Sequence, residues 1–165
     1  LSGCNDTITL DSPSLNIGTI LEKNDETGQG TYLILTFKVK ESFGEITYDD
    51  SLLQTNVLLK KNGETIANNF ARGPYGWNGL VASDFENSDV YASFLYQNLE
   101  VYSGETGNSQ KLMDIDFDEM LVFIRYTHMI GERFRSNEII FTKEELQKVI
   151  IQKEIAVQVN FIKGS

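Results

Sequence analysis

The sequence predicts a mainly β protein: an antiparallel β-sandwich with one short helix near residues 142–151, before the last strand. Short segments in which apolar and polar residues alternate recur along the 165 residues of the chain, as in half-buried strands. Clusters of Gly, Asn and Asp separate these segments, as turns do. Many short strands with a single late helix are typical of a sandwich or a barrel.

The strongest strand pattern in the first third of the chain lies at residues 32–40. It predicts a buried face formed by Leu33, Leu35, Phe37 and Val39. We expect a shorter strand at residues 17–21 and a minor one around residues 46–48.

A β-hairpin is predicted at residues 56–68. Two strand segments flank Asn62 and Gly63, and an Asn-Gly pair supplies the positive φ angles of a type I′ turn. Residues 72–79 follow, with three glycines, a proline and the only tryptophan of the chain. We expect a loop there, because glycine and proline interrupt regular structure.

The second half of the chain predicts further strands. Residues 90–102 fit either a helix or a strand, and a strand is favoured for residues 99–102. Residues 112–117 and 120–126 predict two strands, of which the second is apolar on both faces and therefore central. Residues 138–141 predict one more short strand.

The predicted helix begins with a capping box formed by Thr142 and Glu145. Leu146, Val149 and Ile150 follow at helical spacing, which places them on one face. Residues 154–162 then alternate, and their apolar set predicts the inner face of a last strand: Ile155, Val157, Val159 and Phe161.

The first four residues, Leu-Ser-Gly-Cys, resemble the lipobox of bacterial lipoproteins. In that family an aliphatic residue and two small residues precede the cysteine that receives diacylglycerol and becomes the first residue after signal peptidase cleavage. The resemblance implies that Cys4, the only cysteine, carries a lipid. It also implies a place in the cell envelope, anchored to a membrane and facing outside the cytoplasmic membrane, or in the periplasm or outer membrane of a Gram-negative cell.

The expected organisation is a lipobox remnant with a flexible polar tether at residues 1–15, and a single sandwich domain at residues 16–165. The array of strands is similar to the small immunoglobulin-like domains of uncharacterised bacterial lipoproteins, with Tyr32–Phe37 where those have an early core strand. The chain lacks the Cys…Trp…Cys spacing of true immunoglobulins. A lipocalin-like barrel is the alternative, since its helix also precedes a last strand, although a Gly-x-Trp motif near the N-terminus is absent.

Charge restricts the partners. The formal net charge is −10 and the isoelectric point is near 4.5, whereas nucleic acid phosphates require clustered Lys and Arg. We therefore expect no nucleic acid partner. The apolar segments after Cys4 are too short to span a membrane, so the membrane is contacted through the lipid alone.

The acidic residues Asp114, Asp116 and Asp118 alternate with apolar ones. Alternate carboxylates resemble the start of a calcium loop, but Glu119 stands where an EF-hand requires glycine. In a strand the same three aspartates share the solvent face. We favour the solvent face and keep calcium as the alternative.

Other charged residues give no catalytic pattern. Arg125, Arg133 and Arg135 could hold an anion, but in so acidic a chain we expect them to pair with nearby acids. The only histidine, His128, is expected at a strand end, because no second histidine or nearby thiol completes a zinc or nucleophile site. We predict no enzymatic activity and no cofactor.

The predicted function is a lipid-anchored binding or interaction module in the cell envelope, with an extracellular protein or glycan as partner. Arg72, Tyr75 and Trp77 are the candidate contact residues, because aromatic rings in a glycine-rich loop suit stacking and hot spots. Trp77 could instead fold back into the core. Two alternatives remain: an envelope hydrolase with paired carboxylates and a lipocalin-like carrier of a small ligand.

Overall fold

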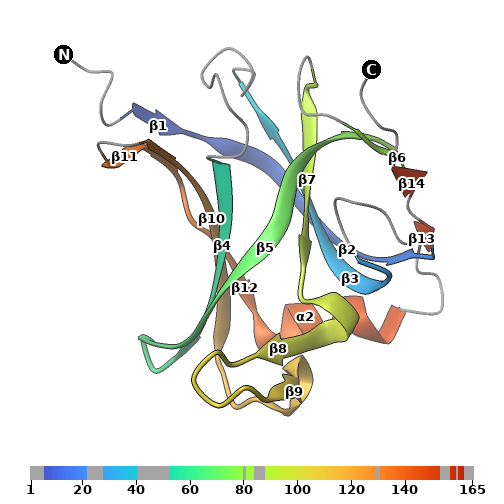
Figure 1. The fold of residues 1–165 in the computed structure, drawn as a ribbon, viewed down its shortest axis with the longest axis vertical. Helices are drawn as coiled ribbons and strands as arrows, with labels where there is room; N and C mark the ends of the chain where they lie inside the picture. Colours follow the sequence, from blue (N-terminus) through green and yellow to red (C-terminus); the bar gives the residue numbers. More distant parts are fainter. Residues whose placement is uncertain are drawn as a thin grey trace.

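The computed structural model describes residues 6–21, 28–40, 53–79, 81–83, 88–128, 131–152, 157–158 and 160–161. Cys4 and the minor strand expected at residues 46–48 lie outside these residues. The described strands form two sheets that pack face to face and share one long strand, β5 (Glu64–Asn78), which crosses the molecule diagonally in Figure 1.

The first sheet also contains β1 (Asp6–Ile8), β4 (Leu53–Lys61), β10 (Glu119–His128), β11 (Gly131–Ser136) and β12 (Ile139–Thr142). The second also contains β2 (Leu10–Ile20), β3 (Gly30–Val39), β6 (Val81–Ser83), β7 (Val90–Leu95), β13 (Val157–Gln158) and β14 (Asn160–Phe161).

The order of hydrogen-bonded strands runs β1-β11-β10-β4-β5-β7-β3-β2-β13. Most pairs are antiparallel, and the exceptions lie where the termini of the described chain join the sheets: β1 with β11, β13 with β2, and β14 with β6. Among the described strands this order is an open path. The sandwich prediction is therefore confirmed, and the described strands do not form the closed barrel of the alternative.

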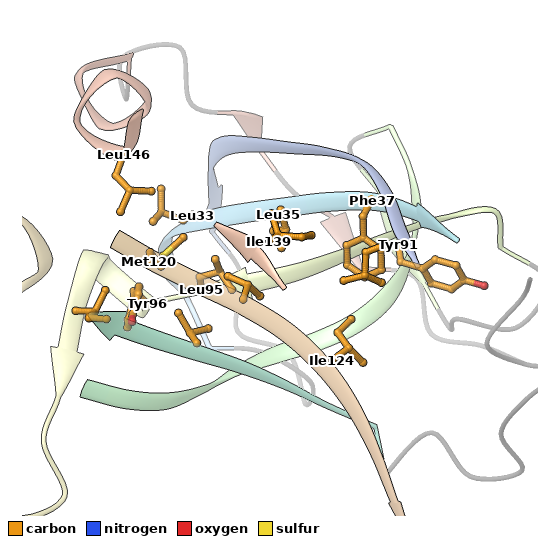
Figure 2. Close-up of a cluster of buried hydrophobic side chains, with 14 of the residues drawn as sticks. Leu33, Leu35, Phe37, Tyr91, Leu95, Tyr96, Met120, Ile124, Ile139 and Leu146 are labelled. Atoms are coloured by element: carbon orange, nitrogen blue, oxygen red, sulfur yellow. The ribbon is translucent and has the colours of Figure 1, made fainter. Parts of the chain in front are cut away.

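The main core lies between the two sheets (Figure 2). Leu33, Leu35 and Phe37 of β3 are at most 1% exposed, and Val39 is also buried, as the alternation predicts. They face side chains of β4 and β10 in the other sheet, among them Val57, Leu59, Met120, Val122 and Ile124.

A second apolar cluster covers the opposite face of β3. Tyr32 and Ile34 are buried there with Phe94 of β7, and Tyr75 and Trp77 pack against them. The strand at residues 32–40 is therefore buried on both faces at its start, as far as Leu35, whereas Lys38 and Lys40 are exposed, as predicted for a half-buried strand.

β5 changes its partner from β4 to β7 between Ala71, which pairs with Thr55, and Arg72, which pairs with Phe94, and its register with β7 shifts directly afterwards at a bulge formed by Gly73 and Pro74. Gly73 has a φ of +106°, and a Cβ atom there would lie 2.8 Å from the Ala92 carbonyl oxygen. Only glycine meets both conditions without strain. The bulge explains why a segment with so many glycines is a strand and not the loop that its composition predicts.

The helix α2 (Lys143–Ile151) confirms the capping-box prediction. Thr142 Oγ1 accepts a hydrogen bond from the Glu145 amide at 3.2 Å, and Glu145 Oε1 accepts one from the Thr142 amide at 3.2 Å. Leu146 is fully buried and points from the helix toward Leu33 (Figure 2). No helix among the described residues is long and apolar enough to cross a membrane.

One prediction differs from the structure at the N-terminal side. Residues 6–8 and 10–15, expected in the flexible tether, belong to β1 and β2, and Leu10 is only 3% exposed. β2 accommodates Pro13 because this residue lies at the register shift between Asp11 and Ser14, where β2 has no regular pairing with β3.

One further segment decides an alternative that the sequence left open, and another differs from its prediction. Residues 90–95 form β7, a strand buried at nearly every position, so the alternation that identifies an exposed strand is missing. Residues 112–117 contain a 3₁₀ helix, η4 (Leu112–Asp114), in place of the predicted strand. For the last strand, β13 and β14 match part of residues 154–162, and the burial of its side chains lies outside the described residues.

The crossing gives a stability prediction. Gly73→Ala should destabilise the protein by about 3 kcal/mol, because it combines an unfavourable positive φ with the contact to Ala92. Gly63→Ala is the matched control: its φ is +80°, but a Cβ atom meets nothing within 4 Å, so the cost should be about 1 kcal/mol. Urea denaturation followed by circular dichroism measures both, and equal losses would contradict the role of the close approach.

Candidate functional site

The candidate site lies where β7 leaves β5. β7 pairs with β5 near Arg72 and ends at Leu95, and the chain then turns at Tyr96, which has a positive φ of 53°. It continues through the 3₁₀ helix η3 (Gln97–Leu99) into a separate hairpin of β8 (Glu100–Tyr102) and β9 (Ser109–Lys111). This hairpin stands apart from the two sheets in Figure 1.

The departure of β7 leaves the first half of β5 with one neighbour. Residues Glu64–Ala71 pair with β4, and among the described strands they have no partner on the other side. A side-chain hydrogen bond connects this edge with the hairpin: Asn69 Nδ2 donates to the Tyr102 carbonyl oxygen at 2.9 Å.

Two depressions flank that contact, and we call them together the β5 groove. The larger, of about 500 Å³, is lined among others by Phe70, Arg72, Phe94, Tyr96, Asn98 and Glu100. The smaller, of about 430 Å³, is lined among others by Ile66, Asn68, Val101, Glu105, Gln110 and Ile115. Asn69 and Tyr102 line both.

The side chains of the β5 groove combine exposed aromatic rings with amides. Phe70 is 65% exposed and Tyr102 is 58% exposed. Large apolar side chains exposed beside a concave polar surface are typical of binding sites. Asn69 Oδ1 and the Tyr96 hydroxyl are buried and have no hydrogen-bond partner within the described part of the chain, and such groups require an explanation.

Burial also changes the acidity of the tyrosines here. Burial raises the pKa of the Tyr96 hydroxyl strongly. Burial also raises the pKa of Tyr32, against the opposing effect of the Arg72 charge, and the Tyr32 hydroxyl donates to the Gly28 carbonyl oxygen at 2.9 Å. Both hydroxyls are therefore neutral donors at neutral pH and not bases.

Of the three predicted contact residues, only Arg72 lines the β5 groove. Tyr75 and Trp77 lie further along β5 and pack on Phe94, with ring centroids at 5.7 and 6.2 Å. Both are half-buried in the outer apolar cluster. Sequence reasoning missed Phe70 and Tyr102, since a single exposed aromatic residue in a strand has no distinguishing pattern.

The predicted acidic cluster binds a lysine. Lys61 Nζ lies 3.1 Å from Asp116 Oδ1 and 3.3 Å from Asp118 Oδ1, and the Asn62 amide donates to Asp118 Oδ2 at 2.7 Å. Asp114, Asp116 and Asp118 are all exposed while Phe117 is buried, so the alternation of burial holds although the segment is not a strand. Within the described residues no group of three or more His, Cys, Asp or Glu is arranged to hold a metal ion.

The arginines have partners other than the predicted acids. Arg125 Nε donates to Gln54 Oε1 at 3.0 Å, and the Arg135 guanidinium lies 3.8 Å from the centroid of the Phe123 ring. His128 is the last residue of β10, as expected. The side chains of His128 and Arg133 lie outside the description.

No protein-family model, no curated protein and no solved structure matches this chain.

The position of Trp77 gives a second stability prediction. Trp77→Ala removes a half-buried ring from the outer cluster and should cost about 2 to 3 kcal/mol, less than a fully buried tryptophan. Phe70→Ala, at a ring that is 65% exposed in the β5 groove, should change stability by less than about 0.5 kcal/mol. Urea denaturation followed by circular dichroism compares them, and a larger loss for Phe70→Ala would remove Phe70 from the list of contact residues.

The contact of Asp118 with Asn62 and Lys61 predicts a pH dependence. The hydrogen bond from the Asn62 amide, together with Lys61, lowers the pKa of Asp118. A lowered pKa in the folded state stabilises the protein above the unfolded value, about 3.9, and this stabilisation is lost as the pH falls through the folded pKa.

Asp118→Asn should therefore lower the melting temperature at pH 7, and the difference from the wild type should shrink as the pH falls below about 4. Glu144→Gln, on the exposed side of α2, makes the same change of charge away from Lys61 and controls for net charge. Differential scanning calorimetry at several pH values measures both, and a difference for Asp118→Asn that is constant down to pH 2 would contradict this assignment.

Proposed function

We propose that the protein is a non-catalytic binding module, anchored to an envelope membrane by a lipid on Cys4, that holds its ligand in the β5 groove. The observation that carries the proposal is the combination of two exposed aromatic rings, Phe70 and Tyr102, with a polar depression of about 500 Å³. Aromatic rings and amide side chains bind ligands by stacking and hydrogen bonding without donating reactive groups.

The rigidity of the walls supports this function. One wall is the strand β5, which pairs with β4 in regular register from Ala67 to Ala71. The other begins at η3, where Asn98 Oδ1 accepts from the Thr31 amide at 3.2 Å and Gln97 Nε2 donates to the Gln29 carbonyl oxygen at 2.6 Å. A site on pre-formed walls binds with little ordering cost.

The anchor is tested in a bacterial host that lipidates proteins. We expect the precursor to incorporate labelled palmitate and to fractionate with the membrane, because Leu1–Cys4 resembles a lipobox. Cys4→Ala should abolish both. A Cys4→Ala protein that still incorporates palmitate would contradict the anchor and leave the binding site to be tested alone.

The site is tested by placing a photo-cross-linking amino acid at position 70 of the chain in intact cells. The matched control places it at Ile140, which is 50% exposed on β12, outside the groove. We expect a discrete adduct from position 70 and none from position 140, since a bound ligand lies within reach of the groove only. The same adducts from both positions, or none from either, would count against the β5 groove.

A further inference from the structure

We infer that the free edge of β5, residues Ala67–Ala71, binds an extended polypeptide with basic side chains as an added strand. The inference rests on the proposed function, because it names the ligand class of the β5 groove. Both depressions of the groove lie along this edge and are lined by its residues.

The backbone of this edge is unpaired on one side among the described strands. Every residue of a strand carries a backbone donor and an acceptor, and those on an unpaired side form a template for another strand. Ala67–Ala71 pairs in regular register with β4, and no described strand pairs with its other side. At about 3.4 Å per residue the edge is roughly 17 Å long, the length of an ordinary strand.

This edge lacks the charged residues and prolines that often prevent other strands from pairing with an exposed edge. Proteins block exposed edges with lysine, proline, inward-pointing charges or bulges. The segment Ala-Asn-Asn-Phe-Ala contains neither a charge nor a proline, and the bulge of β5 lies before it, at Ile66, where the register with β4 shifts. An unprotected edge beside an open groove indicates that a partner strand covers it.

Asn69, at the centre of the edge, has an incomplete set of hydrogen bonds among the described residues. Its Nδ2 already donates to Tyr102, but its Oδ1 is buried and has no partner among the described residues. A strand added to β5 brings peptide amides to this side and supplies the donor that Oδ1 lacks. A sugar ring would use the aromatic residues but leave the backbone of the edge unpaired.

The negative net charge of the protein favours a basic peptide over a second copy of the chain at this edge. The chain has a formal net charge of −10, so a second copy docking edge to edge meets repulsion, whereas a basic peptide is attracted. Near the edge the charges are mixed, because Glu64 stands opposite Lys61 and Glu100 opposite Lys111 in the strand registers, and Arg72 and Glu105 line the groove. The preference for lysine or arginine flanking the bound segment therefore rests on the net charge of the chain.

The experiment uses the full chain purified in detergent and a labelled nonapeptide, Lys-Thr-Val-Thr-Val-Thr-Val-Thr-Lys, with blocked ends. Fluorescence polarisation should show saturable binding at or below about 1 mM peptide. Two analogues carry N-methyl groups on alternate amides, one set for each edge of the peptide. A strand bound through one edge needs only that edge's amides, so one analogue should lose binding and the other should retain it.

A pair of protein variants tests the same edge. Ala67→Lys places an inward-pointing charge at the edge, and its flexible stem can reach solvent past the groove. Ile140→Lys adds the same charge on β12, outside the groove, at a side chain that is 50% exposed. We expect Ala67→Lys to weaken peptide binding at least about tenfold and Ile140→Lys to leave it within about twofold.

Several results would overturn the inference. These are no peptide binding at about 1 mM, equal behaviour of the two N-methyl analogues, and equal behaviour of a folded Ala67→Lys and Ile140→Lys. Self-association through β5, seen as a concentration-dependent dimer that Ala67→Lys abolishes, would assign the edge to a second copy. Binding of a chito-oligosaccharide that Tyr102→Ala abolishes, without peptide binding, would overturn the peptide and leave the proposed binding module standing. The analogue comparison needs no change to the protein, so a variant that fails to fold does not remove the test.

Discussion

The structure depends on the crossing of β5 between the two sheets at Gly73. A strand that serves both sheets must bend sharply, and the bend frees backbone groups that the ladder would otherwise pair. Thr55 Oγ1 donates to the Gly73 carbonyl oxygen at 3.2 Å and also shares a hydrogen bond with Ser93 Oγ at 2.9 Å. Both side chains are almost fully buried. The carbonyl group of Gly73 therefore receives its hydrogen bond from a side chain inside the core.

The same crossing creates the candidate site. From Arg72 onward β5 pairs with β7, and up to Ala71 it pairs with β4 in the other sheet. β7 cannot follow both halves, so it ends at Leu95 and the chain leaves the sandwich as the β8–β9 hairpin. The free edge of β5 is therefore a consequence of how one strand joins two sheets, and not an independent feature.

The chain segment that contains the β8–β9 hairpin is held by hydrogen bonds at both of its ends. At its start, Asn98 and Gln97 bond to the backbone at Thr31 and Gln29. At its end, the Asp118 amide donates to the Lys60 carbonyl oxygen at 2.8 Å, and the Asp118 carbonyl oxygen accepts from the Lys143 amide at 3.0 Å. Between these ends the Asn69 to Tyr102 hydrogen bond joins the hairpin to β5, and Val101 of β8 is buried in the main core. The hairpin is therefore a wall of the groove that is held in place before a ligand binds.

The sequence by itself determined the elements whose signals are local. The alternation in β3, the Asn62-Gly63 turn with φ angles of 52° and 80°, and the capping box of Thr142 and Glu145 all depend on residues a few positions apart. Local periodicity and turn chemistry fix such features before any tertiary contact forms.

Tertiary structure decided the rest. The glycines and proline at residues 73–76 predict a loop, and they form a bulged strand because β7 and Thr55 hold them in place. The role of Asp118 depends on the hairpin at Lys61, which lies beside it only in the folded protein. The candidate site likewise combines β5 with the hairpin at residues 100–111, which no sequence spacing relates. These features arise from contacts between distant segments, and backbone pairing between such segments leaves little trace in the identity of the side chains.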